Sequence, residues 1–293
     1  MKKAAIFLMS FLVSLGSAMA QPGASLSSVE DLMHQSGIWV QVAQYEPMVQ
    51  LGLTQAQNQD KQADKNDNLW AVRQAVATYY AADRLREEVK NQLAASLSQK
   101  DINSVLKWLS TDLGKRLTAL EEQAGEHQPD PEQAAQAVQA LSPKRRKLID
   151  QFVKATRVGE SSASVVINTT LGMTHGMSLV MSPEKKSDLQ ELKKTLLAQK
   201  PKMVKMFSEY SVTTFALIYE SVSDRDFQKY LSFAESAAGR KYHEAVIQAI
   251  DAAMTKAATD MGREIGKGIK AAGIAGEGLV LASYPRNMAC FVS

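Results

Sequence analysis

The chain has 293 residues, of which 34 are Lys or Arg and 31 are Asp or Glu, so its formal net charge is +3. This near balance argues against a general nucleic-acid binder, for which a strongly basic domain is expected, but it does not exclude a local basic patch. The single cysteine, Cys290, excludes an internal disulfide and leaves that thiol either free or linked to another molecule.

Residues 1–20 have the three parts of a signal peptide. Two lysines precede an apolar run from Ala4 to Leu15, and the segment from Ala18 to Ala20 has the small-x-small pattern of a signal peptidase site. The run is too short to cross a bilayer, which takes about 20 apolar residues, and no Cys follows the site to carry a lipid anchor. We therefore expect an exported protein that begins at Gln21, in the periplasm or secreted.

Residues 21–124 form the first predicted unit, and their pattern is helical. Apolar residues at helical spacing run from Ser27 to Leu53, where Pro47 predicts a kink or break. The polar stretch from Gln55 to Asn68 predicts a mobile loop or a solvated helical turn. A long amphipathic helix is then expected from Leu69 to Leu93.

A tract from Leu97 to Leu120 closes this unit, and a tract from Val222 to Ala245 repeats it at a fixed offset of 125 residues without a gap. Each begins with Ser-x-x-Asp, in which the hydroxyl accepts from a backbone N–H and the acid favours the positive helix end. Each continues with apolar residues in steps of three and four, and then with Thr or Ser three residues before Gly, which predicts a bend between two helices. The pairs that superpose include Ser98 and Ser223, Asp101 and Asp226, Trp108 and Phe233, Thr111 and Ser236, and Gly114 and Gly239. We therefore predict an internal duplication.

The second tract also carries a family pattern. Asp226, Phe233, Ser236 and the run from Gly239 to Lys241 supply an acidic helix start, an aromatic residue, a Ser, and then Gly with two basic residues. This order resembles the bacterial family called domain of unknown function 2059, although Ala237 stands where that family often places Pro. The resemblance implies a small helical envelope domain and supplies no activity, cofactor or catalytic residue.

Residues 125–142 are predicted to be a linker with a bridging helix from Glu132 to Leu141, and residues 143–256 to be the second unit. This unit opens with the basic run from Lys144 to Lys147. Charge runs usually form a solvated helix face, which is our interpretation, and a site for anionic lipid or cell-wall polymer is the alternative.

The least polar interior stretch runs from Val165 to Met181. Gly172 and Gly176 share one helix face and predict close packing, while Met173 and Met177 fill irregular space. We interpret this stretch as core. A Met-rich groove for a hydrophobic ligand or a partner helix is the alternative.

Residues 257–293 form a Gly-rich C-terminal tail, in which each glycine weakens a helix by about 1 kcal/mol relative to Ala. Apolar residues between the glycines predict a marginal helix that docks on the body of the protein. Contact with a membrane surface is the alternative.

No catalytic, cofactor-binding or metal site is predicted. Glu121 and Glu122 are neighbours on a helix, which points them apart rather than at one bond. The run from Gly266 to Gly268 lacks dinucleotide-binding spacing, and the segment from Gly159 to Ala163 lacks the closing Gly of a nucleophile elbow. The histidines lack metal-ligand spacing and are predicted to be hydrogen-bonded or to face solvent; they are His34, His127, His175 and His243.

We therefore predict an all-α protein made of two tandem copies of a multi-helix unit and a Gly-rich C-terminal segment. The leading functional hypothesis is a non-catalytic exported envelope protein that binds a protein or cell-envelope partner through helix faces, without nucleic acid, a cofactor or a transmembrane helix. The second is a carrier of an apolar molecule in a groove between the copies, lined by Met173, Met177, Phe207 and Phe215. The third is an enzyme with dispersed acids. Pairing through Cys290 would make the protein a dimer.

Overall fold

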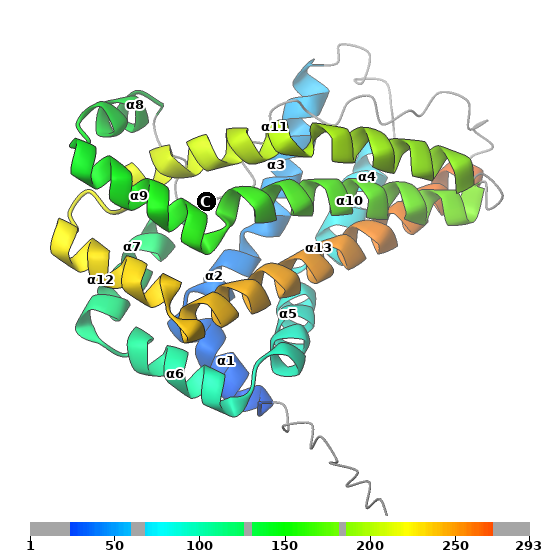
Figure 1. Ribbon diagram of the computed structural model, residues 1–293. Helices are drawn as coiled ribbons and strands as arrows, with labels where there is room; N and C mark the ends of the chain where they lie inside the picture. The colour runs from blue at the N-terminus through cyan, green and yellow to red at the C-terminus, as the bar shows by residue number, and fades with distance from the viewer. Residues whose placement is uncertain (1–23, 60–67, 126–130, 182–185, 272–293) are drawn as a thin grey trace, which may run out of the picture.

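The computed structural model describes residues 24–59, 68–125, 131–181 and 186–271. Within these ranges every regular element is an α-helix and none is a β-strand, which confirms the predicted all-α class (Figure 1). The first half contains α1 (Leu26–Gln35), α2 (Ile38–Ala43), α3 (Tyr45–Gln59), α4 (Asn68–Tyr79), α5 (Ala82–Ser96), α6 (Gln99–Leu109) and α7 (Asp112–Gly125). Then come α8 (Pro131–Gln139), α9 (Pro143–Thr156), α10 (Val158–Met181), α11 (Lys186–Ile218), α12 (Asp224–Glu235) and α13 (Ala237–Ala271). The predicted signal peptide, His127 and Cys290 lie outside the described residues.

The first helices break where the backbone can turn. The Ser25 hydroxyl caps α1 by accepting a hydrogen bond from the Ser28 N–H. Gly37, with φ of 76°, makes the turn into α2, since a left-handed conformation suits glycine. The break predicted at Pro47 lies before it, between α2 and α3. Pro47 itself is tolerated in the first turn of α3, because a backbone N–H there would have no partner within the helix.

The single helix predicted from Leu69 to Leu93 is wrong. The chain leaves the helical conformation at Ala81, which has φ of −49° and ψ of 132°, and so divides the segment into α4 and α5. The break leaves the Tyr80 side chain buried at the junction and turns Leu85 and Val89 of α5 into the core. Neither Gly nor Pro marks this position, so local propensity does not reveal it.

The two predicted bends are built by the same hydrogen bonds. Between α6 and α7 the Thr111 hydroxyl donates to the Trp108 carbonyl (2.7 Å) and accepts from the Gly114 N–H (3.0 Å). Between α12 and α13 the Ser236 hydroxyl donates to the Phe233 carbonyl (2.7 Å) and accepts from the Gly239 N–H (3.0 Å). Descent of the two tracts from one ancestral unit stays a prediction.

The helices that follow the bends are exchanged between the halves. In α7, Leu117 is buried with residues of α9, α11 and α12 in the core of the second half. In α13, Tyr242 and the apolar residues that follow it are buried with α1, α2, α4, α5 and α6 in the core of the first half. Figure 1 shows α13 running from α12 past α5 and α4, so that each half is completed by a helix of the other.

Helix α10 packs closely on α13. A Cβ at Gly172 would lie 2.9 Å from the Thr255 carbonyl oxygen, and a Cβ at Gly176 would clash with the Thr259 carbonyl. Met173 is buried, so the predicted core role is confirmed there, whereas Leu179 near the end of the stretch is exposed. The predicted boundary at 256–257 falls inside α13, whose end packs on α10 through Gly262.

Within the described ranges, none of the helices has the length and apolar character needed to cross a membrane.

Candidate functional site

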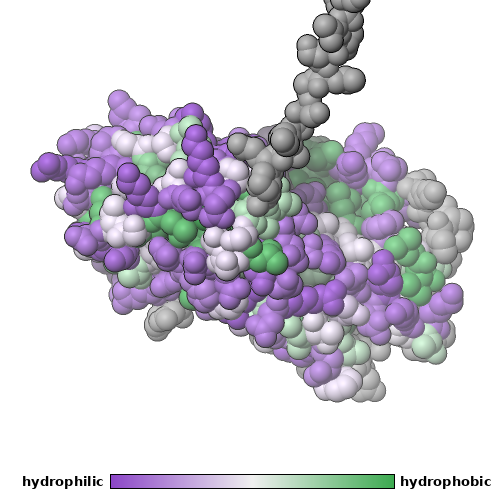
Figure 2. Space-filling view, turned by 90° about the horizontal axis from the view of Figure 1, so that it is seen from below, coloured by the Kyte–Doolittle hydropathy of each residue, from purple (hydrophilic) through white to green (hydrophobic). Residues whose placement is uncertain are grey.

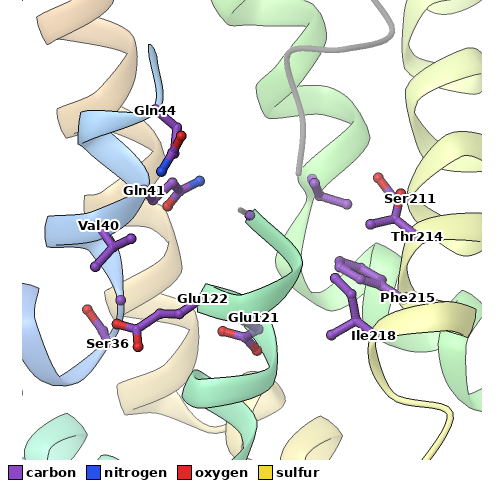
Figure 3. A pocket seen from close by; sticks show the side chains of 13 residues that line it. Ser36, Val40, Gln41, Gln44, Glu121, Glu122, Ser211, Thr214, Phe215 and Ile218 are labelled. Carbon is purple, nitrogen blue, oxygen red and sulfur yellow. The ribbon is translucent and has the colours of Figure 1, made fainter. Parts of the chain in front are cut away.

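A pocket of about 210 Å³ lies where the two halves meet. Its walls come from α2 on one side and α11 on the other, with the C-terminal end of α7 between them (Figure 3). The apolar part of the lining is formed by Val40, Val158, Phe215 and Ile218. The polar part comprises Ser36, Gln41, Gln44, Glu121, Glu122, Ser211 and Thr214.

Glu121 is tied to the second half by one carboxylate oxygen. Its Oε1 accepts hydrogen bonds from the hydroxyls of Tyr219 (2.7 Å) and Tyr230 (2.8 Å), which belong to the loop after α11 and to α12. The other oxygen, Oε2, accepts from no described group. A carboxylate has room for about four hydrogen bonds, so Glu121 keeps acceptor capacity on the side that lines the pocket.

The surroundings perturb the protonation of all three groups. Burial raises the pKa of the Glu121 carboxyl; the tyrosine hydrogen bonds oppose this effect, and the like charge of Glu122 adds to it. Burial and the nearby Glu121 carboxylate raise the pKa of Tyr219 and of Tyr230 well above the ordinary value. Both hydroxyls therefore stay protonated and act as donors.

An aromatic cluster holds these tyrosines in place. The rings of Tyr219 and Tyr230 both contact Phe152, at centroid distances of 6.1 and 4.5 Å. Arg145 donates to the Tyr219 carbonyl (2.6 Å) and lies 4.3 Å above the Phe227 ring. The interpretation of the basic run as wholly solvated is therefore wrong at Arg145, which is buried because it closes this cluster.

A second pocket of about 230 Å³ adjoins the first and shares Gln41, Val158 and Phe215 with it. His243 of α13 lines this second pocket, and its Nε2 is buried without a hydrogen-bond partner among the described residues. Burial lowers the pKa of His243 to about 4, so the ring is neutral near pH 7. The prediction that every histidine is hydrogen-bonded or faces solvent is therefore wrong for His243.

The other predicted residues are distributed over the molecule. His34 stacks on Trp39 at 4.3 Å, and His175 is exposed on α10. The described residues contain no group of three or more His, Cys, Asp or Glu that could hold a metal ion. Glu121 and Glu122 do point toward different walls, as expected for helix neighbours, but both line the same pocket (Figure 3).

The groove residues predicted for a carrier do not come together. Met173 lies in the core of the first half, with Met177 packed against it. Phe207 is buried in a separate small cluster with Ala163 and Val166. Only Phe215 of the four lines the pocket between the halves, so the predicted groove lining is wrong for the other three.

Comparison with known proteins supports the family resemblance. Residues 83–144 match a family model described as "Uncharacterized protein conserved in bacteria (DUF2059)". The match confirms the resemblance to domain of unknown function 2059, but it lies on the first tract and not on the residues of the second tract that carry the pattern. It covers nearly all of α5 and the whole of α6, α7 and α8, and so includes the first bend and Glu121. The comparisons with curated proteins and with solved structures found no match.

Proposed function

We propose that this protein is an exported, non-catalytic binding protein that takes a small organic molecule into the pocket between its two halves. The observation that carries the proposal is Glu121, a partly buried carboxylate at the junction of the halves. Two tyrosine hydroxyls hold one of its oxygens, and the other oxygen, on the pocket side, accepts from none of the residues that the structure describes. Burying a carboxyl group is unfavourable unless its hydrogen bonds are made, so a donor on a bound molecule would complete the site.

Binding through exposed helix faces has less support. On the face seen in Figure 2, hydrophilic side chains predominate, and hydrophobic ones lie in separate small groups. The large apolar side chains that are exposed are spread over α1, α3, α4, α10 and α11; they are Leu26, Leu51, Trp70, Leu179, Leu197 and Met206. A helix-docking surface is expected to be a continuous apolar patch, which favours the pocket over the faces.

The location and the absence of catalysis are supported by the sequence. The lysines, apolar run and Ala-x-Ala ending of residues 1–20 favour export. The pocket lining supplies carboxylates, amides and hydroxyls without a nucleophile and base in contact, which favours binding over reaction. N-terminal sequencing of the protein from a periplasmic extract should begin at Gln21, and a chain that still begins at Met1 in every fraction would contradict export.

The binding proposal is tested by filling the pocket. Protein purified without detergent is expected to retain a small molecule that native mass spectrometry detects as added mass and that denaturation releases. Val40→Trp places an indole in the pocket and should abolish retention. Leu51→Trp, on the exposed part of α3, should leave it unchanged and serves as the matched control. Native protein without added mass, which also binds none of the probes named below, would overturn the proposal.

A further inference from the structure

The charges of the pocket are not balanced. Of the described residues that line it, Glu121 and Glu122 are charged, and both are acids; no Lys, Arg or His is present in the lining. Neither carboxylate forms an ion pair with a described residue. The hydroxyls that hold Glu121 are neutral donors, so they orient the carboxylate without cancelling its charge.

The uncommitted acceptors lie beside an aromatic ring. The Oε2 of Glu121 and the carboxylate of Glu122 accept from no described group, and Phe215 stands on the opposite wall (Figure 3). An ammonium group in the pocket could donate to either carboxylate and approach the ring face. A neutral donor could form hydrogen bonds but would leave both negative charges uncompensated in a partly enclosed space.

We infer that the ligand is a small organic monocation, with an amine or similar head at Glu121 and Glu122 and an apolar body against Phe215 and Ile218. This inference rests on the proposed function and names the chemical class of its ligand. The two free carboxylate acceptors supply the charge complement, and the apolar wall supplies burial for the remainder of the molecule.

The dimensions limit the size of the ligand. A pocket of about 210 Å³ is smaller than the roughly 300 Å³ at which sites for drug-sized molecules begin. A single ring or short chain fits this volume. A longer body would pass Phe215 into the second pocket, where His243 offers an uncharged nitrogen and none of the described lining residues is an acid. The far end of such a ligand is therefore expected to be uncharged.

The test uses three probes that share one body and differ in charge: 2-phenylethylamine, 2-phenylethanol and phenylacetate. Isothermal titration calorimetry with the mature chain at pH 7.5 should give a Kd for the amine at least about tenfold below that for the alcohol, since a charge-assisted hydrogen bond to a carboxylate is stronger than a neutral one. Phenylacetate should bind weakest, because it adds a third negative charge.

The variants separate the charge from the fold. Glu122→Gln should weaken amine binding about tenfold and leave alcohol binding unchanged, because Glu122 forms no hydrogen bond that the fold needs. Glu244→Gln, which neutralises an exposed acid of α13, is the control and should alter neither. Glu121→Gln should have the larger effect on the amine, and its circular dichroism spectrum and urea midpoint would show whether the fold is kept.

The outcomes distinguish the two proposals. Equal affinity for the three probes, or a preference for phenylacetate, would overturn the cation inference while leaving the pocket as a binding site. The same holds if Glu122→Gln binds the amine as tightly as the native chain. Failure of all three probes, together with native protein that retains no added mass, would overturn the proposed function itself.

Discussion

The two bends of the chain have the same local construction and different roles. In each, a side-chain hydroxyl donates to the backbone carbonyl of an aromatic residue (2.7 Å) and accepts from the backbone N–H of a glycine (3.0 Å). After the first bend the chain continues for the 14 residues of α7, and after the second for the 35 residues of α13. The bend after α12 therefore positions much more of the core than the bend after α6.

The two bends also contact each other. Trp108 and Phe233, which occupy equivalent positions, stack at 4.8 Å with an angle of 9° between the rings. Each bend sends its next helix into the core of the other half. The stability of each half therefore depends on the other half through paired positions. Substitutions at those positions measure how much each bend contributes to the free energy of unfolding.

The largest effect is expected at the glycines of the bends. An added Cβ at Gly114 would lie 2.5 Å from the Trp108 carbonyl oxygen, and one at Gly239 would clash more closely with the Phe233 carbonyl. These are backbone atoms, so the helices must move apart. We expect Gly239→Ala to reduce the free energy of unfolding by about 3 kcal/mol and Gly114→Ala by about 2 kcal/mol, measured by urea denaturation.

Gly268→Ala is the control for these substitutions, because it lies in α13 and nothing is found within 4 Å of its added Cβ. It should be neutral or stabilise the protein by up to about 1 kcal/mol. If Gly239→Ala unfolded at the same urea concentration as the native chain, the close approach at the second bend would be refuted.

The stacked pair comes next. We expect Trp108→Ala and Phe233→Ala each to reduce the free energy of unfolding by about 2 kcal/mol, since both rings are only partly buried. The double variant should lose about 1 kcal/mol less than the two single losses together, because the stack can be lost only once. Trp70→Ala, at a ring that is 71% exposed, should change stability by less than about 0.5 kcal/mol. Additive losses would show that the bends do not support each other.

The sequence predicted the bends because their determinants are local. A capping Ser, an apolar stripe and a hydroxyl three residues before a glycine all lie within one tract. It did not predict the exchange of α7 and α13, because a stripe such as that around Leu117 shows that a face is buried but not which helices cover it. The break at Ala81 was missed for a related reason: it serves the burial of Tyr80 and not a local propensity.

The sequence did not predict the pocket around Glu121. The tyrosines that hold Glu121 stand 98 and 109 residues away from it, and neither lies in a motif with it. Phe215 was placed correctly between the halves, but as part of a Met-rich groove that does not exist. The groups that surround Glu121 come from distant parts of the chain, so they are visible only in three dimensions. Helix spacing predicted only that Glu121 and Glu122 point apart.

His243 and Thr118 occupy equivalent positions after the two bends and differ in their partners. The Thr118 hydroxyl donates to the Gln35 carbonyl (3.3 Å), whereas the His243 Nε2 has no partner within the part of the chain that the structure describes. Burial lowers the pKa of His243 from 6.5 to about 4, so between these values the unfolded chain binds a proton that the folded chain does not. Stability from this group is therefore complete above pH 6.5 and falls as the pH drops toward 4.

In the native chain, His243 should make the free energy of unfolding fall by on the order of 2 kcal/mol between pH 7 and 4.5, and His243→Phe should remove this fall. The value is smaller than the full pKa shift would give, because part of the ring is exposed. Urea denaturation at several pH values measures this slope. His175→Phe, at the exposed histidine of α10, should keep the native slope. A native slope in His243→Phe would show that the ring is hydrated in solution.

The smallest effect is expected at the acids that begin the paired tracts. Asp101 caps α6 and also accepts from Lys241 of α13 at 2.5 Å, whereas Asp226 pairs with Lys229 one turn along its own helix. Partial burial alone would raise the pKa of Asp101, but the hydrogen bonds from Lys241 and Ser98 lower it to about 2. Its stabilisation is therefore present above pH 3.8 and is lost as the pH falls toward 2.

Asp101→Asn should reduce the free energy of unfolding by about 1 kcal/mol at pH 7, after allowance for solvent screening, and by much less at pH 2.5. Asp226→Asn should have a smaller effect in urea denaturation, because its ion pair joins no separate elements; equal losses would mean that the link from α6 to α13 adds nothing to the cap.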